Sequence, residues 1–248
     1  METRGNDRKL ARLATFSAVT LACSALLLGG TTTLADDDDS RSGVPSGRAT
    51  GSRYLVTITN LTYDQIISPP VVVVHDGRFS LFQPGQQAGD ELAALAEDGM
   101  TGPLAGLLEA STGVIDYAVA GGGIPPAGSV TVEVSARGNG MMLSLAGMLV
   151  STNDAFVGLD GYRLPSGFFA AFGATSVDAP AYDAGSEANT ESCDHIPGPP
   201  CGSPGVRVTD GAEGFVHVHR GIRGGGDLDD SAKDWKNPVA RVTVRMTN

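Results

Sequence analysis

Carboxylates cluster in two loop-like segments of the chain, and clustered carboxylates are the groups that hold hard cations in proteins. Asp154 stands just before a short apolar run, and Asp183 and Glu187 lie four positions apart around Gly185. Glycine lets a chain turn tightly, so both acids of this turn can face one centre. Ca²⁺ takes six to eight oxygen ligands, and these acids are candidates for them. Such turns are also common on solvated surfaces, so the residue types alone leave calcium as one interpretation among others.

The same segments resemble a known family. NDAFVGLDG followed by PAYDAGSEAN looks like the PDWFVGV…WDAGTD pattern of the spondin N-terminal domain, a secreted calcium-binding β-sandwich module. The likeness extends upstream through YLVTITNLT and downstream to DWKNPVARVTVRM, and covers about residues 54–246. It implies a secreted bacterial member of this family, a calcium-binding adhesion or recognition module without catalytic activity.

The resemblance also assigns the calcium ligands. Carried over residue by residue, they fall on Asp154, Asp183 and Glu187. This chain departs from the family pattern at two places. Ala155 stands where the family has an aromatic residue, and Glu187 replaces an Asp, which keeps the charge and lengthens the side chain. Neither change removes an oxygen ligand, so we expect the calcium site to be retained.

Histidines suggest an alternative metal site. His217 and His219 form an H-x-H pair in a strand-like run, so both rings project from the same face. His75 follows the apolar run of residues 71–74, and three histidines can hold zinc or copper. The competing interpretation is that these are sheet-face histidines bonded to backbone or acids. A transition-metal protein or metalloenzyme using His75, His217 and His219 is therefore the second hypothesis, and a purely structural envelope protein is the third.

Composition and missing motifs narrow the function. The 28 Asp and Glu residues outnumber the 17 Lys and Arg residues, for a net charge of −11 at pH 7, and such a surface repels nucleic acid. The sequence has no Gly-x-Ser-x-Gly elbow, no Walker-type glycine loop and no His-Glu-x-x-His motif. These absences disfavour an enzyme, and the resemblance to the spondin N-terminal domain implies a binding protein whose partner is an extracellular or cell-surface protein or glycan.

The first 35 residues have the layout of a secretory signal peptide: a basic start, a weakly apolar stretch over residues 13–28, and a small-residue cleavage pattern that ends at Ala35. A retained membrane anchor and a lipoprotein modified at Cys23 are the alternatives. We expect export to the extracellular or periplasmic space, with no transmembrane segment in the mature form. Residues 36–53 are acidic and rich in Gly and Ser, which predicts a disordered linker.

Two cysteines remain after the signal peptide. Cys193 and Cys201 flank a proline-rich loop. An even pair in an oxidising compartment predicts a disulfide, and the spacing fits zinc motifs poorly.

Residues 54–248 read as one all-β domain, an antiparallel β-sandwich with one or two short inserted helices. Apolar and polar residues alternate over residues 54–59, 130–134 and 240–246, which is typical of strands with one solvated face. Residues 71–74 and 141–150 are more continuously apolar and suit better-covered strands.

Two helices are expected within this domain, over residues 90–97, capped by Asp90, and over residues 103–109. Their leucines are expected to close one end of the sandwich: Leu92, Leu95, Leu104, Leu107 and Leu108.

Overall fold

Alternating runs of the sequence form β-strands in the computed structural model, which describes residues 51–167, 170 and 173–247. The predicted signal peptide and most of the predicted linker lie outside these residues. The strands are β1 (Ser52–Asn60), β2 (Val71–His75), β3 (Val114–Val119), β4 (Ser129–Ala136), β5 (Met142–Met148), β6 (Ala155–Arg163), β7 (Ala174–Ala179), β8 (Ala181–Asp183), β9 (His217–Val218) and β10 (Ala240–Thr247). The helices are α1 (Asp90–Asp98), α2 (Thr101–Ala110) and α3 (Asp230–Lys233).

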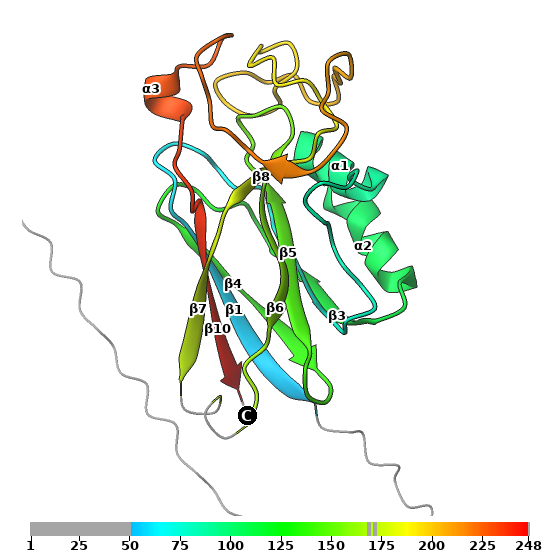
Figure 1. Cartoon of the computed structure of the whole chain (residues 1–248). Helices are drawn as coiled ribbons and strands as arrows, with labels where there is room; N and C mark the ends of the chain where they lie inside the picture. Colours follow the sequence, from blue (N-terminus) through cyan, green and yellow to red (C-terminus); the bar gives the residue numbers. More distant parts are fainter. Residues whose placement is uncertain (1–50, 168–169, 171–172, 248) are drawn as a thin grey trace, which may run out of the picture. The chain divides into compact units, whose positions relative to one another are not determined.

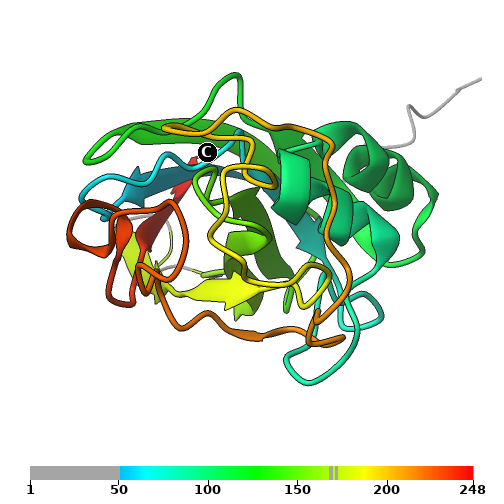
Figure 2. The same ribbon diagram turned by 90° about the horizontal axis from the view of Figure 1, so that it is seen from above.

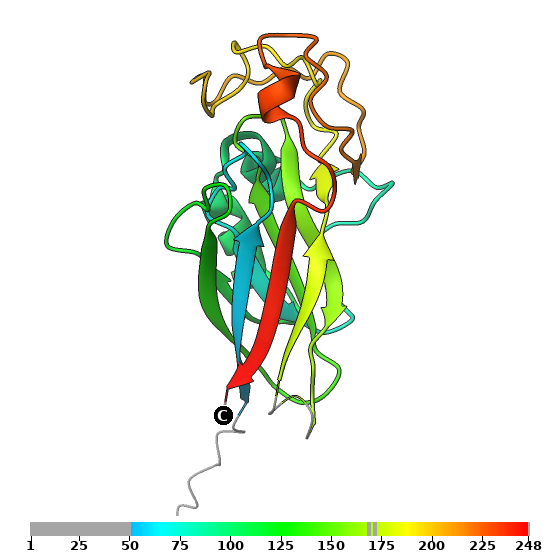
Figure 3. The same ribbon diagram turned by 90° about the vertical axis from the view of Figure 1, so that its left-hand side faces the viewer.

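Two antiparallel sheets form a sandwich, as predicted (Figure 1). One sheet has the strand order β4-β1-β10-β7, and the other has the order β3-β2-β5-β6-β8-β9. In Figure 3 the four-stranded sheet faces the viewer, with the helices α1 and α2 behind it. The predicted all-β class with short inserted helices is therefore confirmed.

The core between the two sheets is formed by the apolar residues that alternate with polar residues along the strands. Val56 and Ile58 of β1 are fully buried and pack in one cluster with Val72 and Val74 of β2. Thr57, which lies between them in the sequence, points away from this core, and its hydroxyl forms a hydrogen bond with the hydroxyl of Thr131 on β4. Successive side chains of a strand point to opposite faces, so one face of each sheet supplies this core.

The opposite face of the six-stranded sheet is also buried. Val71 and Val73 of β2 point away from the sandwich core and pack with Phe156 of β6 in a second apolar cluster. The helices α1 and α2 cover this face, and four of their leucines belong to the same cluster: Leu92, Leu95, Leu104 and Leu108.

The predicted role of these leucines needs correction. They cover a face of the sheet instead of closing an end of the sandwich, because Val71 and Val73 would otherwise expose their side chains to water. Leu107 is not among them, since it is 38% exposed. Asp90 is the first residue of α1 and not its cap: Gly89 holds the N-cap position, where no side chain accepts a hydrogen bond.

Long loops gather at one end of the sandwich, around β8, β9 and α3; Figure 2 looks down on this end. The predicted disulfide between Cys193 and Cys201 is present in the loop that follows β8. None of the helices in the described part of the chain is long and apolar enough to cross a membrane.

The helix packing predicts a contrast between two leucines. Leu95→Ala should lower the free energy of unfolding by about 2–5 kcal/mol, because it removes a fully buried side chain between α1 and the sheet. Leu107→Ala, on an exposed position of α2, should change it by about 0.5 kcal/mol or less. Urea denaturation followed by circular dichroism measures both. Equal effects would mean that the helices do not cover the sheet in this way.

Candidate metal centre

Strand pairing brings two of the predicted calcium ligands together. Ala155, the first residue of β6, pairs with Asp183, the last residue of β8. The carbonyl oxygen of Asp154 accepts a hydrogen bond from the backbone N–H of Ala184 at 3.2 Å. Asp154 and Asp183 therefore lie on neighbouring segments at the loop end, although they are far apart in the sequence.

Asp154 is fully buried, yet only one of its carboxylate oxygens has a partner. Oδ2 accepts hydrogen bonds from the backbone N–H groups of Ser186 and Glu187, at 2.8 and 3.0 Å. Oδ1 is buried and accepts no hydrogen bond from the described residues. An unsatisfied buried acceptor costs about 1–3 kcal/mol, more when it is charged. Such an oxygen beside other acids is suited to hold a cation.

The Asp183 carboxylate is held from both sides. Its Oδ1 accepts the backbone N–H of Gly185 at 2.7 Å, and its Oδ2 accepts the side-chain amide of Asn189 at 2.6 Å. The side chain is 1% exposed. These bonds fix the orientation of the carboxylate at the start of the turn.

The turn after Asp183 requires its glycine. Gly185 has φ +66°, and a Cβ at this position would collide with the backbone of Phe215. The carbonyl oxygen of Gly185 accepts the N–H of Gly214 at 2.8 Å. The turn therefore packs directly against the segment that precedes β9, and this contact brings two further side chains to the site.

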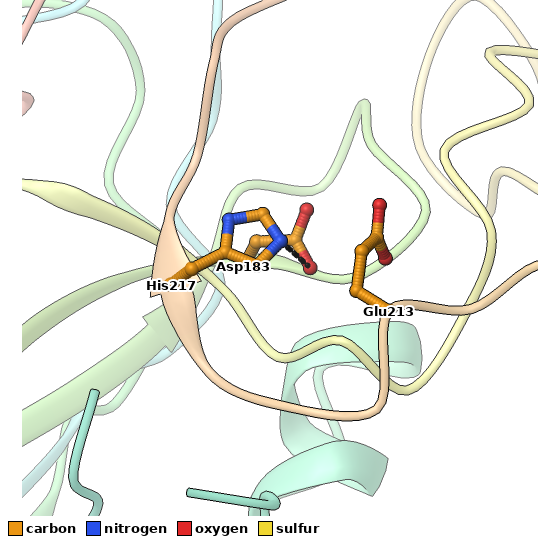
Figure 4. Close-up of side chains that lie close together, drawn as sticks. All are labelled: Asp183, Glu213 and His217. Carbon is orange, nitrogen blue, oxygen red and sulfur yellow. Dashed lines mark ion pairs between the residues drawn. The ribbon is translucent and has the colours of Figure 1, made fainter. Parts of the chain in front are cut away.

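Those side chains are Glu213 and His217, which Figure 4 shows beside Asp183. One ligand atom from each of the three residues lies within 4.8 Å of the others. His217 Nε2 is 3.6 Å from Asp183 Oδ1, and Oε2 of Glu213 is buried without a hydrogen-bond partner among the described residues. An imidazole and two carboxylates thus converge at the loop end.

Glu187, the third predicted ligand, lies next to this group. Its backbone N–H binds Asp154, and its own carboxylate is 2% exposed and accepts the N–H of Val208 at 2.9 Å. The neighbouring Glu97 forms an ion pair with Arg207 at 2.8 Å. Glu187 is therefore close to Asp154, but it is not part of the Asp183, Glu213 and His217 group.

Burial and mutual repulsion raise the pKa values of these acids. Burial, followed by the charge of Asp183, raises the pKa of Asp154 to about 7. Burial also raises the pKa of Asp183, against the opposing effect of its hydrogen bond from Asn189. The pKa of Glu187 rises to about 8, chiefly through burial and then through the charges of Glu97 and Asp154. Ionisation of these buried acids is therefore unfavourable near neutral pH unless a positive charge lies close to them.

His219 lies close to Asp183 but is unsuited to bind a metal. Its Nδ1 accepts the backbone N–H of Gly221 at 2.9 Å, so Nε2 carries the proton and donates to Asn189 Oδ1 at 3.0 Å. Burial, and then the charge of His217, lowers the pKa of His219 to about 3. Both nitrogens of this neutral ring are therefore occupied.

The structure does not bring His75 together with the other two histidines. Its ring nitrogens lie 2.8 Å from the carbonyl oxygen of Asp76 and 2.7 Å from Ser144 Oγ. In the sheet, β2 is separated from β9 by β5, β6 and β8. At about 4.8 Å per strand, this order puts His75 roughly 19 Å from β9. Of the three predicted histidines, only His217 has a nitrogen available beside other metal-ligating groups.

Comparison with known families identifies the domain. The Spondin_N family model matches residues 62–200, more than half of the chain. The chain therefore belongs to the spondin N-terminal family. Asp154, Asp183 and Glu187 fall within the matched residues, whereas Glu213 and His217 follow them. No curated protein matches the chain.

Sequence reasoning missed Glu213 and Asn189. Glu213 lies in a glycine-containing loop just before the H-x-H run, and Asn189 lies two residues after Glu187. The position of Glu213 before a histidine-bearing strand was a usable signal. Its approach to Asp183, however, depends on how the loop folds back onto Gly185, which local sequence does not reveal.

The raised pKa values predict that the stability of the folded protein depends on pH when a chelator keeps the site free of metal. Unfolded Asp and Glu are ionised above about pH 5, while folded Asp154 and Glu187 hold protons up to about pH 7 and 8. Folding therefore binds protons, so stability falls as pH rises through this range. His219 opposes this trend only weakly, because its folded ring is already neutral and its unfolded ring, with a pKa of about 6.5, loses its last half proton above pH 6.5.

Differential scanning calorimetry in EDTA should show a melting temperature a few degrees lower at pH 8.5 than at pH 6.5. Glu187→Gln should reduce the difference, because it removes one of the acids whose pKa is raised by folding. An equal or higher melting temperature at pH 8.5 would contradict the raised pKa values of Asp154 and Glu187.

Proposed function

We propose that this protein is a secreted calcium-binding adhesion or recognition module without catalytic activity, in which calcium orders the loops at one end of the sandwich. Family membership suggests an extracellular recognition or adhesion module. The observation that carries the calcium assignment is Asp154, a fully buried carboxylate with one unpartnered oxygen beside Asp183.

The donor set fits calcium. Asp154, Asp183 and Glu187 supply carboxylate oxygens, and loop carbonyls with water can supply the rest of the six to eight that Ca²⁺ takes. Burial, which is the main cause of the raised pKa values of all three acids, makes their ionised forms unfavourable without a bound cation, and this supports the assignment. A divalent cation would favour the ionised acids and hold the 183–187 turn against the end of β6.

Two apolar side chains next to this site are exposed, one in the loop before β9 and one in β9 itself. Phe215 is 44% exposed and Val218 is 54% exposed, and both lie within three residues of Glu213 or His217. Contiguous exposed apolar patches with a polar rim mark protein interaction sites, and we propose that these two residues belong to such a patch. Calcium that orders these loops would therefore also order a recognition surface for an extracellular or cell-surface protein or glycan.

Calcium should raise the melting temperature of the wild-type protein. A ligand that binds only the folded state stabilises it by mass action. For an extracellular site with a Kd of about 10⁻⁴–10⁻³ M, 5–10 mM calcium should add about 1–3 kcal/mol. That corresponds to a shift of about 2–10 °C relative to EDTA. Scanning fluorimetry measures the shift.

Asp154→Asn and Asp183→Asn should each remove most of this shift. Asp178→Asn is the matched control, because Asp178 pairs with Arg241 on the exposed face of the four-stranded sheet and should leave the shift intact. If the wild type melts at the same temperature in EDTA and in 10 mM calcium, the calcium assignment fails.

Recognition can be tested separately. Fluorescently labelled wild-type protein should bind intact cells or immobilised cell-surface glycans in calcium and lose most of this binding in EDTA or with Asp183→Asn. Binding that is indifferent to both changes would contradict a calcium-dependent recognition role.

A further inference from the structure

The ring of His217 is prepared for metal ligation by a backbone contact. Nδ1 lies 3.1 Å from the carbonyl oxygen of Val218, and a carbonyl only accepts hydrogen bonds, so Nδ1 carries the proton. In the neutral ring Nε2 then has a free lone pair, and this atom lies 3.6 Å from Asp183 Oδ1. Histidines that bind metals usually donate their second ring N–H to a backbone carbonyl or a carboxylate in this way.

Glu213 is positioned in a similar manner. One of its oxygens, Oε1, accepts the side-chain amide of Asn189 at 3.3 Å, and the other, Oε2, is buried without a partner among the described residues. The same Asn189 amide holds Asp183 Oδ2 at 2.6 Å. One amide therefore orients both carboxylates.

Asn189 is in turn oriented by His219. The protonated Nε2 of His219 donates to Asn189 Oδ1 at 3.0 Å, which turns the amide nitrogen of Asn189 toward Asp183 and Glu213. His219 is 6% exposed and its other nitrogen is held by the backbone of Gly221. Supporting hydrogen bonds of this kind fix ligand geometry around metals.

From this geometry we propose that Asp183, Glu213 and His217 form a second cation position, which takes a first-row transition ion, Zn²⁺ in particular. One ligand atom from each residue lies within 4.8 Å of the others without an ion. Ligands about 2.1 Å from a shared zinc ion lie at most about 4.2 Å apart, so small side-chain movements suffice. An imidazole nitrogen with two carboxylates suits zinc, whereas calcium takes oxygen ligands.

This position lies beside the proposed calcium site and shares Asp183 with it, but it does not require calcium to bind. Two of its ligands, Glu213 and His217, lie beyond the residues that the family model matches. The two divalent cations would together offset the charge of four neighbouring acids: Asp154, Asp183, Glu187 and Glu213.

Zinc binding to the untagged full-length protein tests the proposal. After EDTA treatment and removal of the chelator, isothermal titration should find one zinc ion bound per wild-type chain. His217→Ala and Glu213→Gln should each weaken the zinc affinity by about 10-fold or more. His195→Ala is the matched control, because His195 lies in the disulfide loop and should leave zinc affinity unchanged. Absent zinc binding, or equal affinity in wild type, His217→Ala and Glu213→Gln, would overturn the proposal.

Co²⁺ provides a readout that a merely destabilised variant does not mimic. The wild-type Co²⁺ complex should show visible absorption bands of a low-coordinate nitrogen and oxygen site, and His217→Ala should shift or abolish them while its circular dichroism spectrum remains that of the folded protein. Unchanged bands in the folded variant would contradict ligation by His217. If His217→Ala does not fold, the Co²⁺ absorption bands of folded Glu213→Gln provide the same test: unchanged bands would contradict the proposed site.

The two proposals fail separately. A calcium-induced melting shift that persists in His217→Ala while zinc affinity falls supports both sites. Zinc binding without any calcium shift in the wild type would reject the calcium site alone, and a calcium shift without zinc binding would reject the second position alone.

Discussion

The pairing of Ala155 with Asp183 is the contact on which the loop end of this protein depends. It places two acids from distant parts of the chain side by side, with Asp154 and Asp183 almost completely removed from solvent. Burying like charges is unfavourable, because water no longer screens them. The sandwich imposes this arrangement through its strand register, and the surrounding loops must compensate for it.

The compensation is partial. The turn after Asp183 donates two backbone N–H groups to Asp154 Oδ2 and one to Asp183 Oδ1, and Asn189 adds a side-chain amide. Asp154 Oδ1 and Glu213 Oε2 nevertheless keep no partner among the described residues. Active and binding sites are places where such local cost is retained for function. The apolar clusters on both faces of the six-stranded sheet supply the stability that allows it.

Several features of the fold could be predicted from local sequence. Alternating residues such as Val56 and Ile58 indicated strands with one buried face, and the leucines of α1 and α2 indicated helices. Local patterns could not reveal which surface the helices cover, because that depends on Val71 and Val73 pointing out of the sandwich. The disulfide between Cys193 and Cys201 was predicted from the even number of cysteines and the expected oxidising compartment alone.

The site was also predictable only in part, because local sequence patterns do not reveal contacts between distant segments. The family-like motif located Asp154, Asp183 and Glu187. Glu213 could not be found in this way, because its approach depends on Gly185 packing against the backbone near Phe215. The H-x-H spacing predicted that the rings of His217 and His219 project from the same face, and Nε2 of each ring lies within 4 Å of Asp183, although β9 ends at Val218. It could not separate their roles, which are decided by the backbone groups that meet each ring.

Those backbone groups would give the two histidines different roles in the proposed second cation position. The carbonyl oxygen of Val218 fixes the proton of His217 on Nδ1 and leaves Nε2 free, whereas the N–H of Gly221 fixes the proton of His219 on Nε2 and commits it to Asn189. One ring can bind a cation, and the other orients the carboxylates around it. Because Phe215 and Val218 flank His217, a cation bound there would restrain the exposed apolar residues directly. If the proposed sites are occupied, metal binding and the shape of the proposed recognition surface would be coupled through a single short segment, from Glu213 to His219.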